Sequence, residues 1–318
     1  MKKLITMLIA LALVVMADAQ KRITVAQDGS GNYKTVQDAV NAVPDLSGAV
    51  TEIYIKPGIY KERITIPATK INLTLIGENA NTTVLTWDDY ASKLDSSGKA
   101  LGTSRTASLY AMASSFTAKN ITFENSAGAV GQALAIYAGA DRAAFFNCRF
   151  LGFQDTILTN GPGCREYYYN CYIEGATDFI FGPATAYFEK CKIYCKKGGQ
   201  YITAASTSDT TKYGYIFSHC DISGNAPNSS FNLGRPWRQY AKVVYLNCSL
   251  SAVIKDKGWD IWRNEANEKT AYYAEYKNTG PGNQPEKRAT WSHQLTDDEA
   301  KNYTKNLVLR GWEPKQPK

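Results

Sequence analysis

A chain of 318 residues in which 44% are hydrophobic is long enough to bury a large core, and its formal net charge of +7 is modest. Lysine and arginine form no dense block of the kind that follows nucleic acid, so charge alone does not indicate a nucleic-acid partner. Only two histidines are present, His219 and His293, and no G-x-S-x-G segment occurs. A histidine-based metal site and a Ser-His-Asp hydrolase are therefore both disfavoured.

The start of the chain is typical of a secretory signal peptide. A basic pair at 2–3 precedes an apolar run at 4–16 and the small-x-small site ADA at 17–19. We predict cleavage after Ala19, a secreted or periplasmic protein and one domain in residues 20–318, and the MKK start favours a bacterial source. The apolar run is too short to span a bilayer, so no membrane association is predicted. In this setting the positive excess favours an acidic polysaccharide over nucleic acid.

The next predicted element is a short helix within residues 33–44, YKTVQDAVNAVP. Its apolar residues recur at helical spacing and Pro44 ends it. We interpret this helix as a plug for the N-terminal end of the repeat that follows it in the chain. The side chains expected on its apolar face are Val36, Ala39, Val40 and Val43.

A repeat is visible around five of the seven cysteines. Each of these cysteines is flanked by polar residues and then by aromatic or apolar ones, and AKNITF (118–123) has the same pattern with Ile121 in the cysteine position. These positions lie 27, 23, 20, 29 and 28 residues apart, and the alternation is that of a strand. The pattern predicts an all-β fold, a single parallel β-helix with short capping helices. The cysteine segments are FFNCRF (145–150), YYNCYI (168–173), FEKCKI (188–193), FSHCDI (217–222) and YLNCSL (245–250).

The aligned cysteines are interpreted as an internal ladder of small buried side chains, because free cysteine is among the most buried residues. Neighbouring members such as Cys171 and Cys191 could form a disulfide in an oxidising compartment. The sequence leaves this pairing open, and an odd total leaves at least one thiol unpaired within a monomer.

Four segments have polar residues that coil packing does not require. Gln132, Asp155 and Asp178 follow one another at intervals of 23 residues. This interval equals the step between the cysteines at 148 and 171, so we expect the three side chains on successive coils of one face, about 4.8 Å apart. The segments are GQALAIY (131–137), GFQDTIL (152–158), DFIFG (178–182) and LGRPW (233–237).

Gln154 and Asp155 are adjacent, and neighbours on a regular strand face opposite sides. If both serve one site, we expect them at a strand end or a bend. Taken singly, Asp155 is also typical of a loop, and Arg235 of a surface ion pair.

Two carboxylates placed close together cannot both ionise freely, so the pKa of one should rise. If Arg235 contacts Asp178, then Asp178 stays charged as a nucleophile and Asp155 becomes the protonated general acid. Gln132 and Gln154 can then donate amide N–H groups to an oxyanion.

Towards the C-terminus, TDDE at 296–299 is a capping box that predicts the start of a short helix. We interpret it as a cap for the second end of the β-helix.

GFQDTIL, DFIFG and LGRPW, in this order, resemble the signature segments of the pectin methylesterases. GIYKE (58–62), YITAAST (201–207) and YYAEYKNTGPG (272–282) are similar to further stretches of that family. The resemblance implies a right-handed parallel β-helix, no metal or organic cofactor, a monomer, and no inhibitory pro-region before the catalytic part. It also implies hydrolysis of the C6 methyl esters of galacturonate units in pectin through an acyl-enzyme.

The resemblance assigns roles to individual residues. Asp178 is expected to be the nucleophile, Asp155 the general acid and then base, and Arg235 the residue that holds Asp178. Gln132 and Gln154 are expected to stabilise the oxyanion. Gln132 and Arg235 are also expected to contact the substrate, and Trp237 to line the sugar site. Phe181 and Trp259 are expected to add apolar surface near the ester methyl, and Thr103 to contact a neighbouring sugar.

Three alternatives remain open on the sequence. A polygalacturonase or pectate lyase would cleave the polymer, although the Gly-His-Gly segment of the former and the acidic calcium site of the latter are not found in the sequence. A carbohydrate-binding β-helix without catalysis is a second alternative, and it would not need the paired acid and nucleophile. A third is an esterase of this fold that acts on another acyl substrate.

Overall fold

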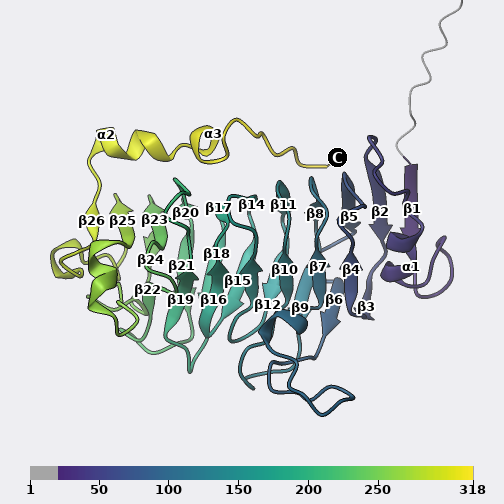
Figure 1. The fold of residues 1–318 in the computed structure, drawn as a ribbon, viewed down its shortest axis with the longest axis horizontal. Coiled ribbons are helices and arrows are strands. Elements are labelled where there is room, and N and C mark those ends of the chain that lie inside the picture. Colours follow the sequence, from purple (N-terminus) through teal and green to yellow (C-terminus); the bar gives the residue numbers. More distant parts are fainter. Residues whose placement is uncertain (1–20, 318) are drawn as a thin grey trace, which may run out of the picture.

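The computed structural model describes residues 21–317, so the predicted signal peptide at 1–19 lies outside this range. Short strands follow one another around three parallel sheets, and each coil stacks on the previous one along a single long axis (Figure 1). All pairings between the named strands are parallel, as expected for the predicted solenoid. One core cluster runs the length of the coil from Ile23 to Ala289.

The strands divide among three sheets, and within each sheet they pair in the following order. The 11-stranded sheet contains β1 (Lys21–Val25), β2 (Thr51–Ile55), β5 (Leu73–Gly77), β8 (Thr117–Lys119), β11 (Ala143–Phe146), β14 (Arg165–Tyr169), β17 (Thr185–Glu189), β20 (Tyr215–Ser218), β23 (Lys242–Leu246), β25 (Tyr272–Tyr276) and β26 (His293–Gln294). The 7-stranded sheet contains β22 (Asn232–Pro236), β19 (Tyr201–Ala205), β16 (Thr177–Gly182), β13 (Ile157–Thr159), β10 (Ile136–Ala138), β7 (Leu109–Ala111) and β4 (Ile64–Ile66). The 8-stranded sheet contains β24 (Ser249–Leu250), β21 (Asp221–Gly224), β18 (Lys192–Cys195), β15 (Tyr172–Gly175), β12 (Arg149–Leu151), β9 (Thr122–Asn125), β6 (Thr83–Trp87) and β3 (Gly58–Lys61).

The cysteine ladder lies at the corner between the 11-stranded and 8-stranded sheets. The residue before each ladder position has a φ between 52° and 56°, which turns the chain from one sheet into the next. Asparagine tolerates this left-handed conformation best after glycine and fills several of these positions. The side chains also bond between coils, since Asn170 Nδ2 donates to Asn147 Oδ1 at 2.7 Å. The residues in this conformation are Asn120, Asn147, Asn170, Lys190, His219 and Asn247.

The five ladder cysteines are buried and all seven cysteines of the chain are free thiols. The ladder is therefore confirmed as a row of small core side chains. The disulfide considered for Cys171 and Cys191 is not formed in this structure.

Aromatic rings fill the interior beside the ladder. Consecutive coils place rings in register on the 11-stranded sheet, with centroids 4.4–4.7 Å apart and interplanar angles of 16° or less. Such stacking adds to the free energy of burying these large apolar surfaces. The stacked series is Phe145, Tyr168, Phe188, Phe217 and Tyr245.

The N-terminal end of the coil is closed by helix α1 (Val36–Asn41), as predicted, with its apolar face buried. Thr35 is the N-cap. Glu62, the last residue of GIYKE, accepts hydrogen bonds from the backbone N–H groups of Val36 and Gln37, both at 3.0 Å. A carboxylate at a helix N-terminus accepts hydrogen bonds from the free N–H groups there, and its negative charge interacts favourably with the helix dipole.

The predicted capping box is present and opens helix α2 (Asp297–Ala300), but the interpretation of this helix as a cap for the second end of the coil was wrong. After β26 the chain turns back and runs along the outside of the 11-stranded sheet through α2 and α3 (Lys305–Val308) (Figure 1). Val308 and Leu309 are buried there against that sheet. Arg288 and Glu275 form a buried ion pair near that end of the coil, with Nε–Oε1 at 2.7 Å.

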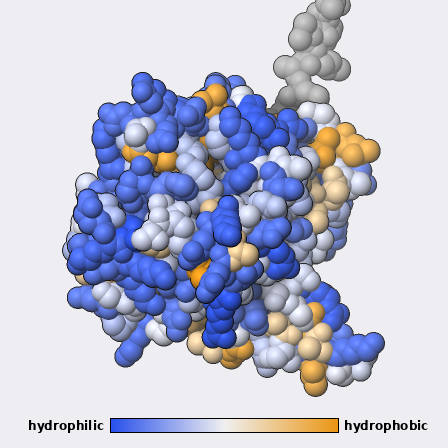
Figure 2. All heavy atoms as spheres, turned by 60° about the vertical axis from the view of Figure 1, so that its left-hand side comes forward, coloured by the Kyte–Doolittle hydropathy of each residue, from blue (hydrophilic) through white to orange (hydrophobic). Residues whose placement is uncertain are grey.

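Four 3-10 helices complete the described elements: η1 (Thr103–Arg105), η2 (Glu265–Lys269), η3 (Pro285–Lys287) and η4 (Lys301–Tyr303). No helix among residues 21–317 is long and apolar enough to cross a membrane. The face in Figure 2 is mostly hydrophilic, and its apolar side chains form small separate patches. Single exposed apolar side chains of this kind are normal on a protein surface.

Candidate active site

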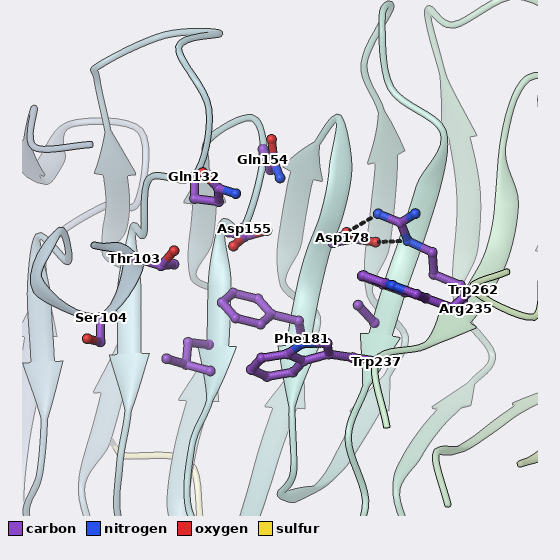
Figure 3. Close-up of a pocket in the computed structure, with 12 residues that line it drawn as sticks. Thr103, Ser104, Gln132, Gln154, Asp155, Asp178, Phe181, Arg235, Trp237 and Trp262 are labelled. Atoms are coloured by element: carbon purple, nitrogen blue, oxygen red, sulfur yellow. Dashed lines mark hydrogen bonds and ion pairs between the residues drawn. The ribbon is translucent and has the colours of Figure 1, made fainter. Parts of the chain in front are cut away.

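An open pocket of about 450 Å³ lies on the outer face of the 7-stranded sheet. Figure 3 shows its side chains gathered from several neighbouring coils. The structure brings together all the sequence-predicted site residues except Trp259. The lining residues are Thr103, Ser104, Gln132, Gln154, Asp155, Leu158, Asp178, Phe181, Ala204, Arg235, Trp237 and Trp262.

The two aspartates occupy equivalent places on neighbouring coils, as predicted. Gln154 pairs with Thr177, and the next residue on each coil is the aspartate. Asp155 has a φ of 64° and Asp178 a φ of 51°, so both lie in the left-handed region. Such a conformation is uncommon for a residue with a side chain and marks a locally constrained backbone.

The bend at Asp155 resolves the conflict between adjacent residues on one strand. Gln154 forms the last bridge before the bend and β13 begins only at Ile157. The left-handed backbone at Asp155 breaks the alternation of a regular strand, and the side chains of Gln154 and Asp155 both line the pocket. The expectation of a bend is therefore confirmed.

The register predicted for Gln132 was wrong by one residue. Gln132 pairs with Gln154, not with Asp155, so the step between these coils is shorter than 23 residues. The consequence is chemical, because the two glutamines lie side by side on adjacent coils above Asp155 (Figure 3). Among the described residues, neither side-chain amide has a hydrogen-bond partner, so both are free to bind a ligand.

Arg235 donates two hydrogen bonds to the carboxylate of Asp178. Its Nε donates to Oδ1 at 2.9 Å and its Nη2 to Oδ2 at 2.6 Å. The guanidinium is itself held between two rings, 3.9 Å from the centroid of Tyr201 and 3.7 Å from that of Trp262. A bidentate, stacked guanidinium has little freedom, so it fixes the orientation of the Asp178 carboxylate.

The surroundings of the two aspartates favour different protonation states. Burial raises the pKa of Asp155 well above its usual range, and the charge of nearby Asp178 raises it further. Burial also raises the pKa of Asp178, but the hydrogen bonds and charge of Arg235 oppose that increase. The pKa of Asp178 stays raised, but less than that of Asp155, so a single shared proton favours Asp155 and the negative charge favours Asp178.

Apolar side chains form the floor of the pocket beside the aspartates. Leu158, Phe181 and Ala204 align in register on three neighbouring strands, and the charged Arg235 continues this row on a fourth. Trp237 packs edge-on against Phe181 with ring centroids 5.7 Å apart. At the other side, Thr103 and Ser104 enter the pocket from η1 (Figure 3).

Trp259 does not belong to the site, contrary to the prediction. It is 0% exposed, and its Nε1 donates to Glu275 inside the core at 3.2 Å. The indole that reaches the pocket is Trp262, which sequence reasoning missed. The segment GWDIW (258–262) contains both tryptophans and could have pointed to Trp262. Because this segment is irregular, the spacing does not indicate which of the two indoles faces the pocket.

The fold and the paired carboxylates place the chain among the β-helix enzymes that act on carbohydrates. A family model described as Pectinesterase matches residues 22–312. Pectinesterase 31 of Arabidopsis thaliana is 43% identical over 289 residues, which cover 89% of this chain and 90% of that protein. The chain therefore belongs to the pectinesterase family, and it is a carboxylic ester hydrolase.

Solved structures agree with this assignment. A pectin methylesterase from carrot superimposes with a TM-score of 0.82 at 34% identity, covering 91% of this chain and 93% of that one. Pectin methylesterase PemA from Erwinia chrysanthemi gives 0.81 at 30% identity, covering 93% and 98%. The predicted right-handed parallel β-helix is confirmed. The relatives come from plants and from a bacterium, so they do not bear out the expectation of a bacterial source.

Proposed function

We propose that this pectinesterase removes C6 methyl esters from galacturonate units of pectin, with Asp178 as nucleophile and Asp155 as general acid and base. The observation that carries the proposal is the bidentate contact between Arg235 and Asp178 beside a second buried carboxyl group. It leaves one charged and one protonated aspartate in the same pocket, which acyl transfer through a carboxylate nucleophile requires.

In the first half of the reaction, the ionised Asp178 attacks the ester carbonyl carbon. The carbonyl oxygen becomes an oxyanion, and the free amides of Gln132 and Gln154 lie on adjacent coils where they can donate N–H groups to it. As the C–O bond to the methoxy group breaks, Asp155 gives its proton to the departing methanol. The product is an anhydride between Asp178 and the sugar carboxyl.

In the second half, Asp155 is a carboxylate and removes a proton from water. The resulting hydroxide attacks the sugar acyl carbon, and the anhydride bond to Asp178 breaks. The galacturonate acid is released, Asp178 returns as a carboxylate, and Asp155 is again protonated. The sum is one ester and one water converted to one acid and one methanol.

The open shape of the pocket and its aromatic walls support a polymeric sugar substrate. Phe181 and Trp237 offer apolar ring surface beside the reacting groups, and Trp262 covers Arg235 on the far side. Sugar rings pack their C–H faces on such surfaces. Thr103, on η1, lines the same pocket, and we propose that it contacts a neighbouring sugar unit.

Methanol release from highly methylated pectin tests the proposal, with polymer length followed in the same samples. We expect methanol at constant chain length from residues 20–318, and at least a thousandfold loss in Asp178→Ala, roughly as for other catalytic nucleophiles. Asp221→Ala, which replaces an exposed aspartate of β21 on the 8-stranded sheet, is the matched control. Shortened chains would favour a polymer-cleaving enzyme, and a folded protein that releases no methanol would contradict the proposal.

Secretion and oligomeric state are part of the same proposal. We propose export by the segment at 1–19 and action as a monomer, supported by the signal-peptide pattern and by the polar face in Figure 2. N-terminal sequencing of the exported protein should begin at Gln20, and light scattering should give the mass of one chain. A retained leader or a dimer mass would contradict these points.

A further inference from the structure

The segment that carries Gln132 lies where the ladder of the 7-stranded sheet is interrupted. Gln132 forms a single bridge with Gln154, and β10 begins only at Ile136. Between these points the N–H of Leu134 bonds to a side chain instead of a backbone carbonyl of a neighbouring strand. The side-chain amide of Gln132 has no hydrogen-bond partner among the described residues, so its place in the pocket depends on how firmly this backbone is held.

The side chain that receives this bond is Thr106, the residue that follows η1. Its Oγ1 accepts a hydrogen bond from the Leu134 N–H at 3.0 Å and donates one to the carbonyl of Thr103 at 2.8 Å. Thr106 is 0% exposed. Loss of its hydroxyl would therefore leave a buried N–H without a partner, which costs free energy.

Asn125, the last residue of β9, supplies a second contact to the same segment. It is buried, and its Nδ2 lies 2.9, 3.1 and 3.0 Å from the carbonyl oxygens of Asp89, Thr106 and Leu134. Its Oδ1 accepts a hydrogen bond from the N–H of Ala127 at 3.0 Å. The amide has two hydrogens for three carbonyl groups, so one hydrogen is shared. One side chain thus joins β9, the loop between β6 and β7, and the segment before β10.

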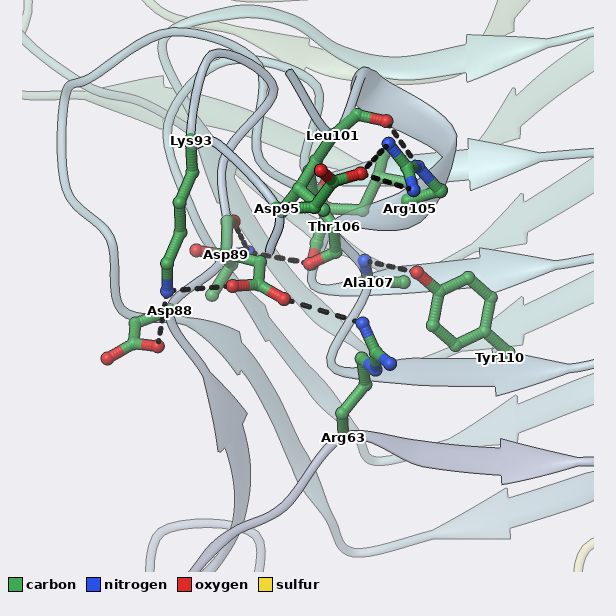
Figure 4. A network of polar contacts seen from close by, with 12 residues as sticks. Arg63, Asp88, Asp89, Lys93, Asp95, Leu101, Arg105, Thr106, Ala107 and Tyr110 are labelled. Atoms are coloured by element: carbon green, nitrogen blue, oxygen red, sulfur yellow. Dashed lines mark hydrogen bonds and ion pairs between the residues drawn. The ribbon is translucent and has the colours of Figure 1, made fainter. Parts of the chain in front are cut away.

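The loop between β6 and β7, at residues 88–108, is itself braced by ion pairs and hydrogen bonds (Figure 4). Arg105 donates to Asp95 Oδ2 at 3.3 and 3.2 Å, which closes the loop on itself. From this loop the N–H of Ala91 donates to the backbone carbonyl of Gln132 at 2.9 Å. Gln132 is therefore held by a braced loop as well as by the two buried polar side chains.

We propose that Thr106 and Asn125 are positioning residues, which hold Gln132 where its amide can donate to the oxyanion. The inference rests on the proposed function, because that function gives Gln132 its role. Neither side chain lines the pocket, so both act through the backbone next to Gln132 and not by touching the substrate. A donor that is already in place needs no reorganisation in the transition state, and a displacement of about 1 Å can cost about 10²-fold in rate.

Thr106→Val tests the proposal, because valine has nearly the same shape but no hydroxyl. We expect its kcat to fall about 10- to 100-fold at unchanged KM, a smaller loss than the roughly 10²- to 10³-fold loss expected of Gln132→Ala. Thr106→Ser keeps the hydroxyl and should restore kcat. Thr185→Val is the matched control, because Thr185 of β17 is also buried and donates to the carbonyl of Tyr213 at 2.6 Å. It loses a buried hydroxyl on the 11-stranded sheet and should keep the wild-type kcat.

Two further measurements separate positioning from a general loss of structure. Hydrogen exchange of the Leu134 N–H, followed by NMR with isotope-labelled leucine, should be faster in Thr106→Val than in the wild type and in Thr106→Ser. In the Gln132→Ala background, Thr106→Val should change kcat by less than about twofold, because its effect passes through Gln132. Asn125→Ala removes three contacts and should lower both kcat and stability, so the Thr106 variants decide the question if it does not fold.

Failure of this inference can be told apart from failure of the proposed function. Three results would overturn the positioning role while methanol release stands. They are a Thr106→Val kcat equal to that of Thr185→Val, a raised KM at normal kcat, and the full loss repeated in the Gln132→Ala background. A wild type that releases no methanol would overturn the proposed function, and exchange of the Leu134 N–H would still show whether Thr106 holds this segment.

Discussion

Asp155 and Asp178 occupy equivalent positions on neighbouring coils, yet only Asp178 is held by Arg235. Both have the same uncommon backbone conformation and both are less than 10% exposed. The difference in their chemistry therefore comes from one guanidinium, which is fixed between two rings. In the proposed mechanism, Arg235 is therefore the residue that makes Asp178 the nucleophile and Asp155 the acid.

Replacing Arg235 with glutamine should reduce kcat/KM by roughly 10²- to 10³-fold, because it leaves a buried carboxylate without its partner. Loss of the cation also raises the pKa of Asp178, which must be ionised to attack. The acidic limb of the pH–rate profile should therefore move to higher pH. A methanol-release assay across the pH range measures both effects.

Arg142→Gln is the control for this experiment, since Arg142 is exposed, lies outside the pocket and approaches Asp141 at 3.9 Å. Its profile should match that of the wild type. An Arg235→Gln variant whose acidic limb does not move would show that Arg235 does not control the ionisation of Asp178.

Replacing Gln154 with alanine should lower kcat by about 10²- to 10³-fold, the typical cost of one oxyanion donor. The KM should change little, because the amide is expected to bind the oxyanion more strongly than the ester carbonyl. Steady-state methanol release resolves the two constants. Gln284→Ala, near the C-terminal end of the coil, should leave both unchanged; a Gln154→Ala variant with an altered KM and a normal kcat would instead indicate a substrate-binding role.

The two tryptophans of GWDIW should respond in opposite ways to truncation. Trp259→Ala removes a fully buried ring and should lower the free energy of unfolding by about 3–5 kcal/mol. Trp262→Ala should leave unfolding nearly unchanged but reduce kcat/KM, since it uncovers Arg235. Urea unfolding and methanol release on both variants distinguish these outcomes. A stable, inactive Trp259→Ala would restore the interpretation of Trp259 as a substrate contact.

The repeat could be predicted from the sequence because the cysteine corner is the most regular part of each coil. Its positions alternate as strands do, and a left-handed residue precedes each one. The register of Gln132 could not be predicted in the same way. The 23-residue step between positions 148 and 171 also relates Gln154 to Thr177, but the preceding coil is one residue shorter, so Gln132 pairs with Gln154. Loop lengths differ from coil to coil, so the number of residues per coil measured at the cysteine corner does not give the register of strands elsewhere in the coil.

The packing of irregular segments could not be predicted from the sequence either. The capping box at 296–299 encodes where α2 begins, but not that the following chain folds back over the 11-stranded sheet. Trp262 and Arg263 have φ values of 54° and 55°, which break the alternation on which the prediction of a strand depends. The motif residues were found because their chemistry is unusual, whereas Trp262 looks like any other aromatic residue.

A carboxyl group inside the coil should make stability depend on pH. Glu166 of β14 is 0% exposed; its Oε2 is 2.7 Å from the hydroxyl of Tyr168. Its Oε1 has no hydrogen-bond partner among the described residues. Burial raises the pKa of Glu166 to about 8, against a usual value of 4.5. Between these two pH values the folded state keeps a proton that the unfolded state has lost, so stability falls as the pH rises.

Glu166→Gln should remove this dependence, because an amide keeps the contact with Tyr168 without ionising. The wild type should lose up to about 1.4 kcal/mol of unfolding free energy per pH unit between pH 5 and pH 8 relative to the variant. Urea unfolding at several pH values measures the difference. The exposed Glu265→Gln should run parallel to the wild type. If Glu166→Gln also runs parallel, Glu166 is ionised in the folded protein at neutral pH and its charge is compensated within the coil.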